Sequence, residues 1–242
     1  MLTKERSGGT RKGRCLIAGL LSMAALLVIT GSASAVPTSQ TLTESLTPAK
    51  QDKKKFGGVS LATVISTNFD NFATSQSPRQ TVFTLPPDVK YVSGNVPACP
   101  LSSIQNKPTA LAQAACPQSI TGGGSAEVNG GALKGVVTFF SGGSNTIYVH
   151  TDIGGALILD IIGTISPTTV AFTNIPNTPG NVLTKFDTVF NKRKTGKNSW
   201  YVEARCKKGK WATTETTSFY SGETLSATAT QKCKQKKSKK KK

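Results

Sequence analysis

The C-terminal half of the chain alternates apolar and polar residues with the two-residue period of β-strands. Residues 181–190 turn Lys185 and Asp187 to one face, and the opposite face carries Val182, Thr184, Phe186, Thr188 and Phe190. In residues 200–207 the predicted inward positions are Trp200, Val202, Ala204 and Cys206, and the outward ones are Tyr201, Glu203, Arg205 and Lys207. This period predicts half-buried strands.

Turn signals separate these runs into hairpins. Glycine clusters recur about every 8–12 residues through the middle of the chain, a spacing typical of consecutive hairpins: Gly122–Gly124, Gly130-Gly131, Gly142-Gly143 and Gly154-Gly155. Two further turns, Lys208-Gly209 and Ser221-Gly222, flank a Thr-rich strand over 211–220. They precede a strand over 223–230 that turns Leu225, Ala227 and Ala229 inward. The only helix we expect is Pro108–Ala115. The pattern predicts an all-β fold, an antiparallel sandwich or barrel-like domain.

The first 35 residues have the composition of a cleavable signal peptide. Residues 1–14 are basic, residues 15–30 are uncharged and apolar, and Gly31–Ala35 supplies the small residues that precede a cleavage site. An apolar stretch of 16 residues is shorter than the roughly 20 that span a bilayer. We therefore expect export, cleavage before Val36 and no transmembrane anchor afterwards. The expected location is secreted or associated with the cell envelope, outside the cytoplasmic membrane.

Two segments of the exported chain contain little that can be buried. Residues 36–58 are polar and Lys-rich, which predicts a disordered leader. Residues 234–242 are almost entirely lysine and predict a disordered tail. A single β-rich domain is expected between them, over 59–233.

Positive charge dominates the chain and is unevenly distributed. Its 30 Lys and Arg outnumber 12 Asp and Glu; without residues 1–35 the net charge falls from +18 to +14. Eight basic residues lie in 192–210 and eight in 232–242. The candidate anion-binding residues are Lys192, Arg193, Lys194, Lys207, Lys208, Lys236, Lys237, Lys239, Lys240, Lys241 and Lys242.

Such charge favours a polyanionic partner, either a wall polymer or anionic lipid headgroups. Nucleic acid is unlikely because no stacking aromatic residues interleave the lysines of the tail. A tail that serves only solubility is an equally good interpretation.

Four cysteines remain after cleavage: Cys99, Cys116, Cys206 and Cys233. An even number in an exported chain predicts disulfides, and of the three possible pairings proximity favours Cys99–Cys116 with Cys206–Cys233. A zinc site would need C-x-x-C spacing, which is absent, and the chain has a single histidine. We expect no metal and no cofactor.

The second disulfide constrains the C-terminal strands. If 200–207, 211–220 and 223–230 were sheet neighbours in that order, the outer two would be about 9.6 Å apart. A disulfide reaches at most about 6.8 Å between Cα atoms. Either the chain leaves the sheet near Thr230 and hooks over the Lys208-Gly209 turn, which we prefer, or the strand order is not sequential.

The single histidine gives the one constellation with catalytic chemistry. His150 shares a strand face with Tyr148 and Asp152, and a hairpin loop at Ile153–Gly155 would place Asp160 opposite Tyr148. A His–Asp pair beside a hydroxyl is the core of a serine hydrolase, so His150, Asp152 and Asp160 are the candidates. No G-x-S-x-G motif accompanies them, and strand neighbours often pair for structural reasons. A metal site on the same residues is less favoured still.

Two cysteine segments carry a resemblance to a known family. The first reads Val96-Pro97-x-Cys99-Pro100, followed by Cys116-Pro117 and Ile120–Gly124. The second includes Tyr201-Val202-x-Ala204-Arg205-Cys206, Gly209-Lys210-Trp211 and Lys232-Cys233-Lys234. This pattern resembles an uncharacterised family of secreted actinobacterial proteins. The resemblance implies export, an all-β fold and paired cysteines, and it transfers no catalytic residue.

Two classes of function therefore stay open. The first is a non-enzymatic envelope or extracellular protein held near anionic surfaces by its basic tail. The second is a secreted hydrolase centred on His150. The absence of a recognisable nucleophile favours the first.

Overall fold

The structure, a computed structural model, describes residues 36–236, which belong to one compact unit. The predicted signal peptide, the Val36 cleavage site and Lys237, Lys239, Lys240, Lys241 and Lys242 of the tail lie wholly or partly outside these residues. The main feature is an antiparallel sheet of 11 strands. In spatial order they are β1 (Pro37–Thr47), β4 (Ser60–Phe69), β12 (Leu183–Phe190), β7 (Ile120–Val128), β8 (Leu133–Gly143), β9 (Thr146–Ile153), β10 (Leu157–Ile165), β11 (Thr169–Phe172), β5 (Pro78–Thr84), β16 (Lys210–Phe219) and β17 (Thr224–Lys232).

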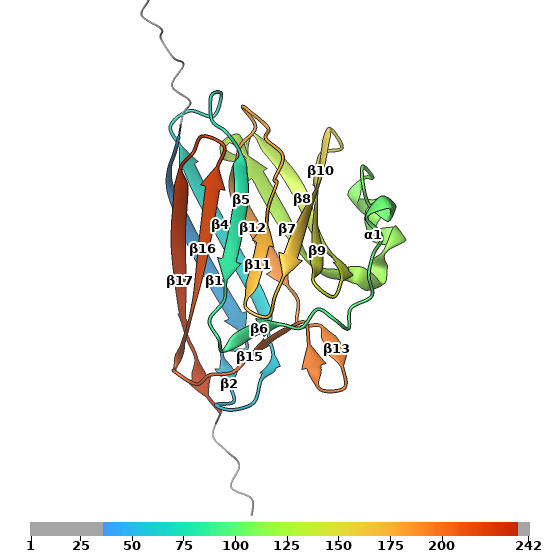
Figure 1. Cartoon of the computed structure of the whole chain (residues 1–242), viewed down its shortest axis with the longest axis vertical. Helices are drawn as coiled ribbons and strands as arrows, with labels where there is room; N and C mark the ends of the chain where they lie inside the picture. Colours follow the sequence, from blue (N-terminus) through green and yellow to red (C-terminus); the bar gives the residue numbers. More distant parts are fainter. Residues whose placement is uncertain (1–35, 237–242) are drawn as a thin grey trace, which may run out of the picture. The chain divides into compact units, whose positions relative to one another are not determined.

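This sheet curls until its two edge strands, β1 and β17, lie side by side (Figure 1). Side chains rather than a backbone ladder join these edges. The Gln231 amide accepts from the Leu46 N–H at 2.6 Å and donates to the Leu46 carbonyl at 3.1 Å. Further along the seam, Leu42 packs against Ala229. The all-β, barrel-like fold predicted from the sequence is confirmed.

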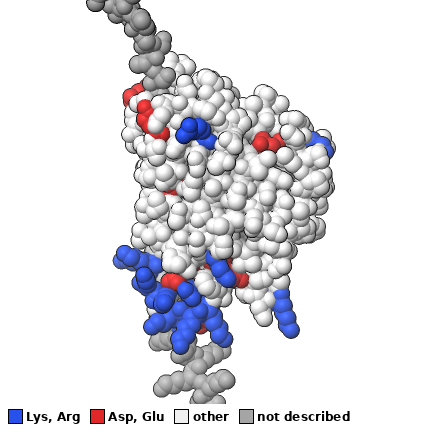
Figure 2. Space-filling model, viewed as in Figure 1, with Lys and Arg blue, Asp and Glu red and all other residues white. Residues whose placement is uncertain are grey.

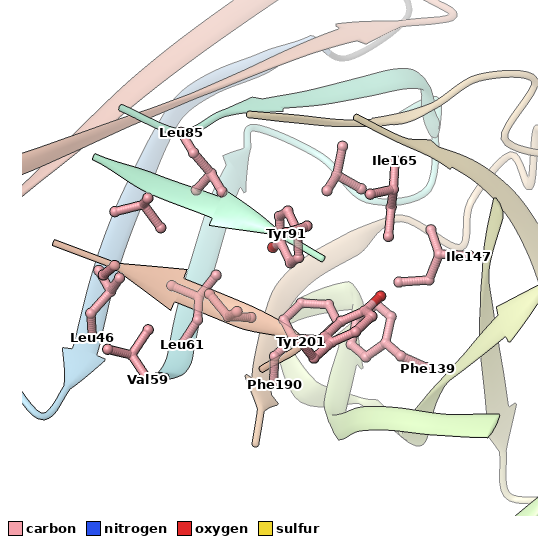
Figure 3. Close-up of a cluster of buried hydrophobic side chains, with 14 of the residues drawn as sticks. Leu46, Val59, Leu61, Leu85, Tyr91, Phe139, Ile147, Ile165, Phe190 and Tyr201 are labelled. Carbon is pink, nitrogen blue, oxygen red and sulfur yellow. The ribbon is translucent and has the colours of Figure 1, made fainter. Parts of the chain in front are cut away.

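A second, three-stranded sheet fills one end of the barrel. It consists of β3 (Gly57–Gly58), β15 (Val202–Ala204) and β6 (Val89–Tyr91), in that order, and we call it the plug. The Tyr201 ring is tilted against the ring of Phe190 in the barrel wall, with centroids 5.9 Å apart. The Tyr91 ring meets the same Phe190 ring edge to face, with centroids 5.7 Å apart. Figure 3 shows the wall side chains converging on these two strands. The main hydrophobic core is therefore at the plugged end of the barrel.

The opposite end of the barrel has no such filling, and we call it the open end. Six of the inward-facing apolar side chains there are only partly buried. They are Phe83, Leu157, Leu159, Ile161, Leu183 and Phe186. The loops at this end include η3 (Asn129–Gly131), the Gly154-Gly155 hairpin and residues 173–182.

Two small sheets and a helical segment complete the unit. β2 (Lys50–Gln51) pairs in parallel with β18 (Lys234–Gln235), and β13 (Lys194–Gly196) forms a hairpin with β14 (Ser199–Trp200). Residues 99–119 contain η1 (Leu101–Ser103), α1 (Thr109–Ala115) and η2 (Pro117–Ser119). This segment, which we call the cap, lies outside the barrel beside β8 and β9 (Figure 1). The expected helix at Pro108–Ala115 is present one residue shorter, with Pro108 as its N-cap.

The prediction of a disordered leader at 36–58 is wrong. Residues 37–47 form β1, which pairs with β4 along its whole length, and residues 50–58 contribute to two small sheets. Only two side chains of β1, Leu42 and Leu46, are large and apolar, so the segment looks too polar to be buried. Threonine and serine occupy most other positions, and threonine suits a strand whose outer face is solvated.

The prediction of disorder from residue 234 is wrong for the residues that the structure describes, 234–236. Lys234 and Gln235 form a short strand, and the N–H groups of Lys234 and Lys236 donate to the carbonyls of Ala49 and Gln51. The domain thus extends beyond 59–233 at both ends, because each terminal segment pairs with the other.

The glycine triplet Gly122–Gly124 is not a turn, as the sequence had predicted, but part of strand β7. A Cβ on Gly124 would lie 2.0 Å from the carbonyl oxygen of Asp187, and one on Gly122 would lie 2.5 Å from that of Val189. These glycines let β7 approach β12 closely. The other three glycine clusters do lie at or next to connections between strands, as predicted.

The three C-terminal strands are not neighbours in chain order. The predicted hook of the chain over the Lys208-Gly209 turn is therefore wrong, and the alternative, a non-sequential strand order, is correct. Residues 202–204 belong to the plug, whereas β16 pairs with β17 and β5. Strand β17 stays in the ladder as far as Lys232, opposite Lys210. Because the plug is buried on both faces, Tyr201 and Glu203 are buried instead of facing outward.

Candidate functional sites

His150 and Asp160 lie directly opposite each other on β9 and β10, on the outer face of the barrel beneath the cap. The sequence had placed Asp160 opposite Tyr148, and the register is two residues away from that prediction. The His150 Nδ1 atom is 2.8 Å from Asp160 Oδ1, and Asp160 Oδ2 accepts the N–H of Asn106 in the cap at 3.2 Å. The pair therefore joins the barrel wall to the cap.

Asp152, the third candidate, makes separate contacts. Its Oδ2 accepts the N–H of Thr109, the first residue of α1, at 3.0 Å, and its Oδ1 accepts the N–H of Gly155 at 2.7 Å. These two hydrogen bonds, that from Thr109 foremost, hold the pKa of the Asp152 carboxyl below its usual range. Asp152 caps a helix and a hairpin, and the structure does not bring it to the His150–Asp160 pair.

The surroundings of His150 give it no access to a substrate. Its side chain has no exposed surface, with the Phe140 ring packed edge-on at a centroid distance of 6.2 Å. Its Nε2 atom, which would accept a proton from a nucleophile, has no hydrogen-bond partner in the described chain. A serine-hydrolase mechanism needs a hydroxyl at that nitrogen and an open position for the acyl group. The described geometry supplies neither, and supports a role in anchoring the cap.

Both predicted disulfides are present. Cys99 and Cys116 are bonded with Cα atoms 5.7 Å apart and close the cap on itself. Cys206 and Cys233 are bonded with Cα atoms 5.9 Å apart and tie the end of the plug strand to the end of β17. Two disulfides are typical of proteins that fold in an oxidising compartment outside the cytoplasm.

Lysines gather on the outer surface of the plugged end. Ten exposed lysines lie on chain segments that contact one another there, and we call this set the basic end: Lys50, Lys53, Lys54, Lys55, Lys207, Lys208, Lys210, Lys232, Lys234 and Lys236. Figure 2 shows a dense group of basic side chains at the lower end of the view, with few acidic side chains among them.

Main-chain contacts hold these segments together. The N–H of Cys206 donates to the carbonyl of Asp52, and that of Cys233 donates to the carbonyl of Gly209. Gln235 reaches the carbonyl of Lys207 through its side chain. Asp52 is the acidic side chain within this group; main-chain N–H groups of Lys55 and Lys54 lower its pKa, so it is ionised at neutral pH.

Residues 192–194, which we had grouped with Lys207 and Lys208, lie elsewhere. Arg193 donates both terminal nitrogens of its guanidinium to the carbonyls of Ile120 and Gln118, so it pins the β13 hairpin to the barrel. Lys192 lies over the Trp200 ring, 5.9 Å from its centroid. In Figure 1 this hairpin is well separated from β2. Lys207, Lys208 and Lys236 do belong to the basic end.

Seven lysines of the basic end were missed as site residues: Lys50, Lys53, Lys54, Lys55, Lys210, Lys232 and Lys234. The lysine run at 53–55 is plain in the sequence. Its position depends on the parallel pairing of β2 with β18, two strands of two residues each, for which the sequence carries no periodic signal.

Two carboxylates point into the barrel near the β1–β17 seam. Thr213 donates a hydrogen bond to Glu44 at 2.8 Å, while Gln40 and Thr217 donate to Glu215. Burial raises the pKa of Glu44 to about 7, and it also raises the pKa of Glu215. Nothing in the sequence pointed to these two glutamates, because no motif contains them and no alternating pattern marked them as buried. Among residues 36–236, no cluster of three or more His, Cys, Asp or Glu could hold a metal ion.

The fold and its surfaces define the class of the molecule: an all-β, disulfide-bonded barrel with one basic end. Within residues 36–236 no helix has the length and apolar character needed to cross a membrane.

Comparisons with known proteins add little to this description. No family model and no curated protein matches the chain. Among solved structures, the crystal structure of BslA, a bacterial hydrophobin, is similar with a TM-score of 0.35 and 13% identity. The match covers 84% of this chain and 98% of that one. Similarity at this level carries no functional information.

Proposed function

We propose that this protein acts outside the cytoplasmic membrane as a non-enzymatic domain that docks on anionic lipid surfaces through its basic end. The observation that supports this most strongly is the gathering of ten exposed lysines at one end of the barrel, with few acidic side chains among them. The two disulfides agree with an extracellular location.

A flat surface suits this arrangement because the lysines come from three separate segments, 50–55, 207–210 and 232–236, and the basic side chains project outward (Figure 2). Each lysine near an anionic membrane contributes about 1 kcal/mol, as an upper bound, since not all of them can lie close at once. The attraction is screened over about 8 Å at physiological salt, so binding weakens as salt rises.

Folded lysines and tail lysines contribute separately to this docking. Lys207, Lys208 and Lys53–Lys55 are fixed by the plug and the Cys206–Cys233 disulfide. Removing residues 237–242 should therefore weaken retention without abolishing it.

The test is sedimentation of the chain without residues 1–35 with vesicles of phosphatidylglycerol, at low and high salt. Glutamine at Lys53, Lys54, Lys207 and Lys208 should weaken binding at least about tenfold. The matched control replaces four exposed lysines elsewhere, Lys134, Lys192, Lys194 and Lys197, and should change binding little.

Equal losses in the two variants would refute docking through the basic end. Binding that survives high salt would contradict an electrostatic mechanism. Retention on purified cell walls without retention on vesicles would contradict the lipid partner and assign the basic end to a wall polymer.

A further inference from the structure

A cavity of about 130 Å³ lies inside the barrel at its open end. Its walls come from strands around the barrel, among them Phe83, Val149, Leu159 and Phe186. Leu133, Pro176 and Asn181 also line it and are exposed, so the cavity has a mouth at the loops of the open end. The plug closes the barrel at the other end.

The size of the barrel accounts for this space. Barrels of about eight strands are just filled by their own side chains, and the diameter grows with the number of strands. A sheet of 11 strands encloses more room than its side chains can fill. The plug fills that room at one end, and no described element enters the other.

No charged residue lines the cavity, and most of its lining is aliphatic or aromatic. Three of its polar side chains have hydroxyl partners: Ser77 and Thr178 pair with each other at 2.7 Å, and Thr81 pairs with Thr217 at 2.8 Å. Such a lining does not hold water firmly, because apolar cavities stay dry and bind apolar molecules of matching size.

The cavity runs along the strands of the barrel wall. Along β9 it extends from Val149 to Ile153, and along the paired strand β10 from Ile161 to Leu157. Four residue steps of a strand span about 13 Å. A volume of 130 Å³ spread over that length is narrow, which suits a chain that enters lengthwise better than a ring.

We propose that this cavity binds the aliphatic chain of a single-chain amphiphile, such as a medium-chain fatty acid, with the polar head group at the mouth near Leu133 and Asn181. A comparable engineered cavity of about 150 Å³ holds benzene, so roughly six to eight carbon atoms fit inside. This ligand site is independent of the basic end, which lies at the other end of the barrel.

The first test fills the cavity from its wall. Ala126 is buried opposite Phe186 and lines the cavity, whereas Ala171 on β11 is turned away from the core that its neighbours Val170 and Phe172 join. Isothermal titration calorimetry with decanoic acid, below its micelle concentration, should give saturable binding at one site. Ala126→Leu should weaken it at least tenfold, and the matched Ala171→Leu should leave it unchanged.

A second variant covers the case in which Ala126→Leu fails to fold. Leu133 is 42% exposed at the mouth, so Leu133→Glu should fold normally and repel the fatty-acid head group. We expect weaker binding of decanoic acid and little change for the uncharged decanol.

Two results would overturn the proposal: the absence of saturable binding by the folded protein, or equal affinity in the Ala126→Leu and unsubstituted proteins. Loss of decanoic acid binding when Lys53, Lys54, Lys207 and Lys208 are replaced by glutamine would also contradict it, since that loss would place the fatty acid on the basic end. The vesicle assay tests docking through the basic end separately, so a negative result there would leave the fatty-acid binding results unchanged.

Discussion

The two ends of the barrel interior are built from the same strands, yet they differ in how well they are filled. On one face of β12, Phe190 at the plugged end is 7% exposed, whereas Phe186, four residues earlier on the same face and at the open end, is only partly buried. Phe190 meets Phe139 at 4.5 Å between ring centroids and also meets both plug tyrosines. Phe186 meets Phe139 at 6.1 Å and otherwise borders the cavity.

This difference shows that wall residues alone do not determine packing in a wide barrel. The plug supplies Tyr91, Tyr201 and Val202, all nearly inaccessible to solvent, and so completes the core around them. Where no plug enters, wall residues such as Phe83, Leu159 and Phe186 are only partly buried and border a cavity. The inserted sheet thus gives the barrel a fully packed core at one end and leaves a cavity at the other.

The most direct test of this difference in packing is to truncate a phenylalanine at each end of the barrel. Phe190→Ala should cost about 3–5 kcal/mol in the free energy of unfolding, the range for large core truncations. Phe186→Ala should cost less than half of that, because part of its surface already faces a cavity. Urea denaturation with the disulfides intact measures both. Equal costs would mean that the two ends are packed alike.

The ionisation of Glu44 reports how far water is excluded from the barrel interior beside the plug, because Glu44 interacts electrostatically with the buried Tyr91. The pKa of Glu44 rises from 4.5 in the unfolded chain to about 7 in the folded protein. Between these values the folded state binds more protons, so stability should fall as pH rises from about 4.5 to 7, by up to about 3 kcal/mol.

Glu44→Gln should remove this pH dependence while keeping an acceptor for Thr213. Unfolding measured at pH 5 and pH 8 should therefore show a variant that gains stability relative to the unsubstituted protein at the higher pH. The same substitution at the partly exposed Glu127 controls for the change in net charge. A constant difference between the two pH values would contradict a dry site around Glu44.

The smallest effect is expected outside the barrel, at the cap. Asp160→Asn weakens both the contact with His150 and the hydrogen bond from Asn106, and should cost about 1–2 kcal/mol. Hydrogen exchange should accelerate in residues 99–119, while decanoic acid binding at the open end stays the same. A change in that binding would mean that cap and cavity are coupled.

Much of the fold could be predicted from local signals. Alternation in residues 181–190 and the hairpin turns at Gly154-Gly155 and Ser221-Gly222 reflect residues that meet only their strand neighbours and the core. The disulfide pairing followed from proximity along the chain. In each case the interaction that decides the structure joins residues that are close together along the chain.

The plug and the basic end could not be predicted in the same way. Strand β15 looks like an ordinary half-buried strand, but it pairs along its two edges with β3 and β6, more than 100 residues away, and its faces are buried in the barrel core. Glu203 is buried there because Lys90 of β6 lies 3.3 Å from its carboxylate. The basic end likewise depends on the two chain termini meeting at β2 and β18. Pairings of such long range leave no period in the sequence.

The side chain of Gln231 has a consequence for how this protein behaves at high concentration. An open sheet of 11 strands would expose two edges, each a template for pairing with another molecule. Here the edges of β1 and β17 face each other, and the Gln231 amide occupies both the N–H and the carbonyl of Leu46 in place of a neighbouring strand. A glutamine, which satisfies a donor and an acceptor at once, can thus protect a β-rich protein from strand-to-strand aggregation.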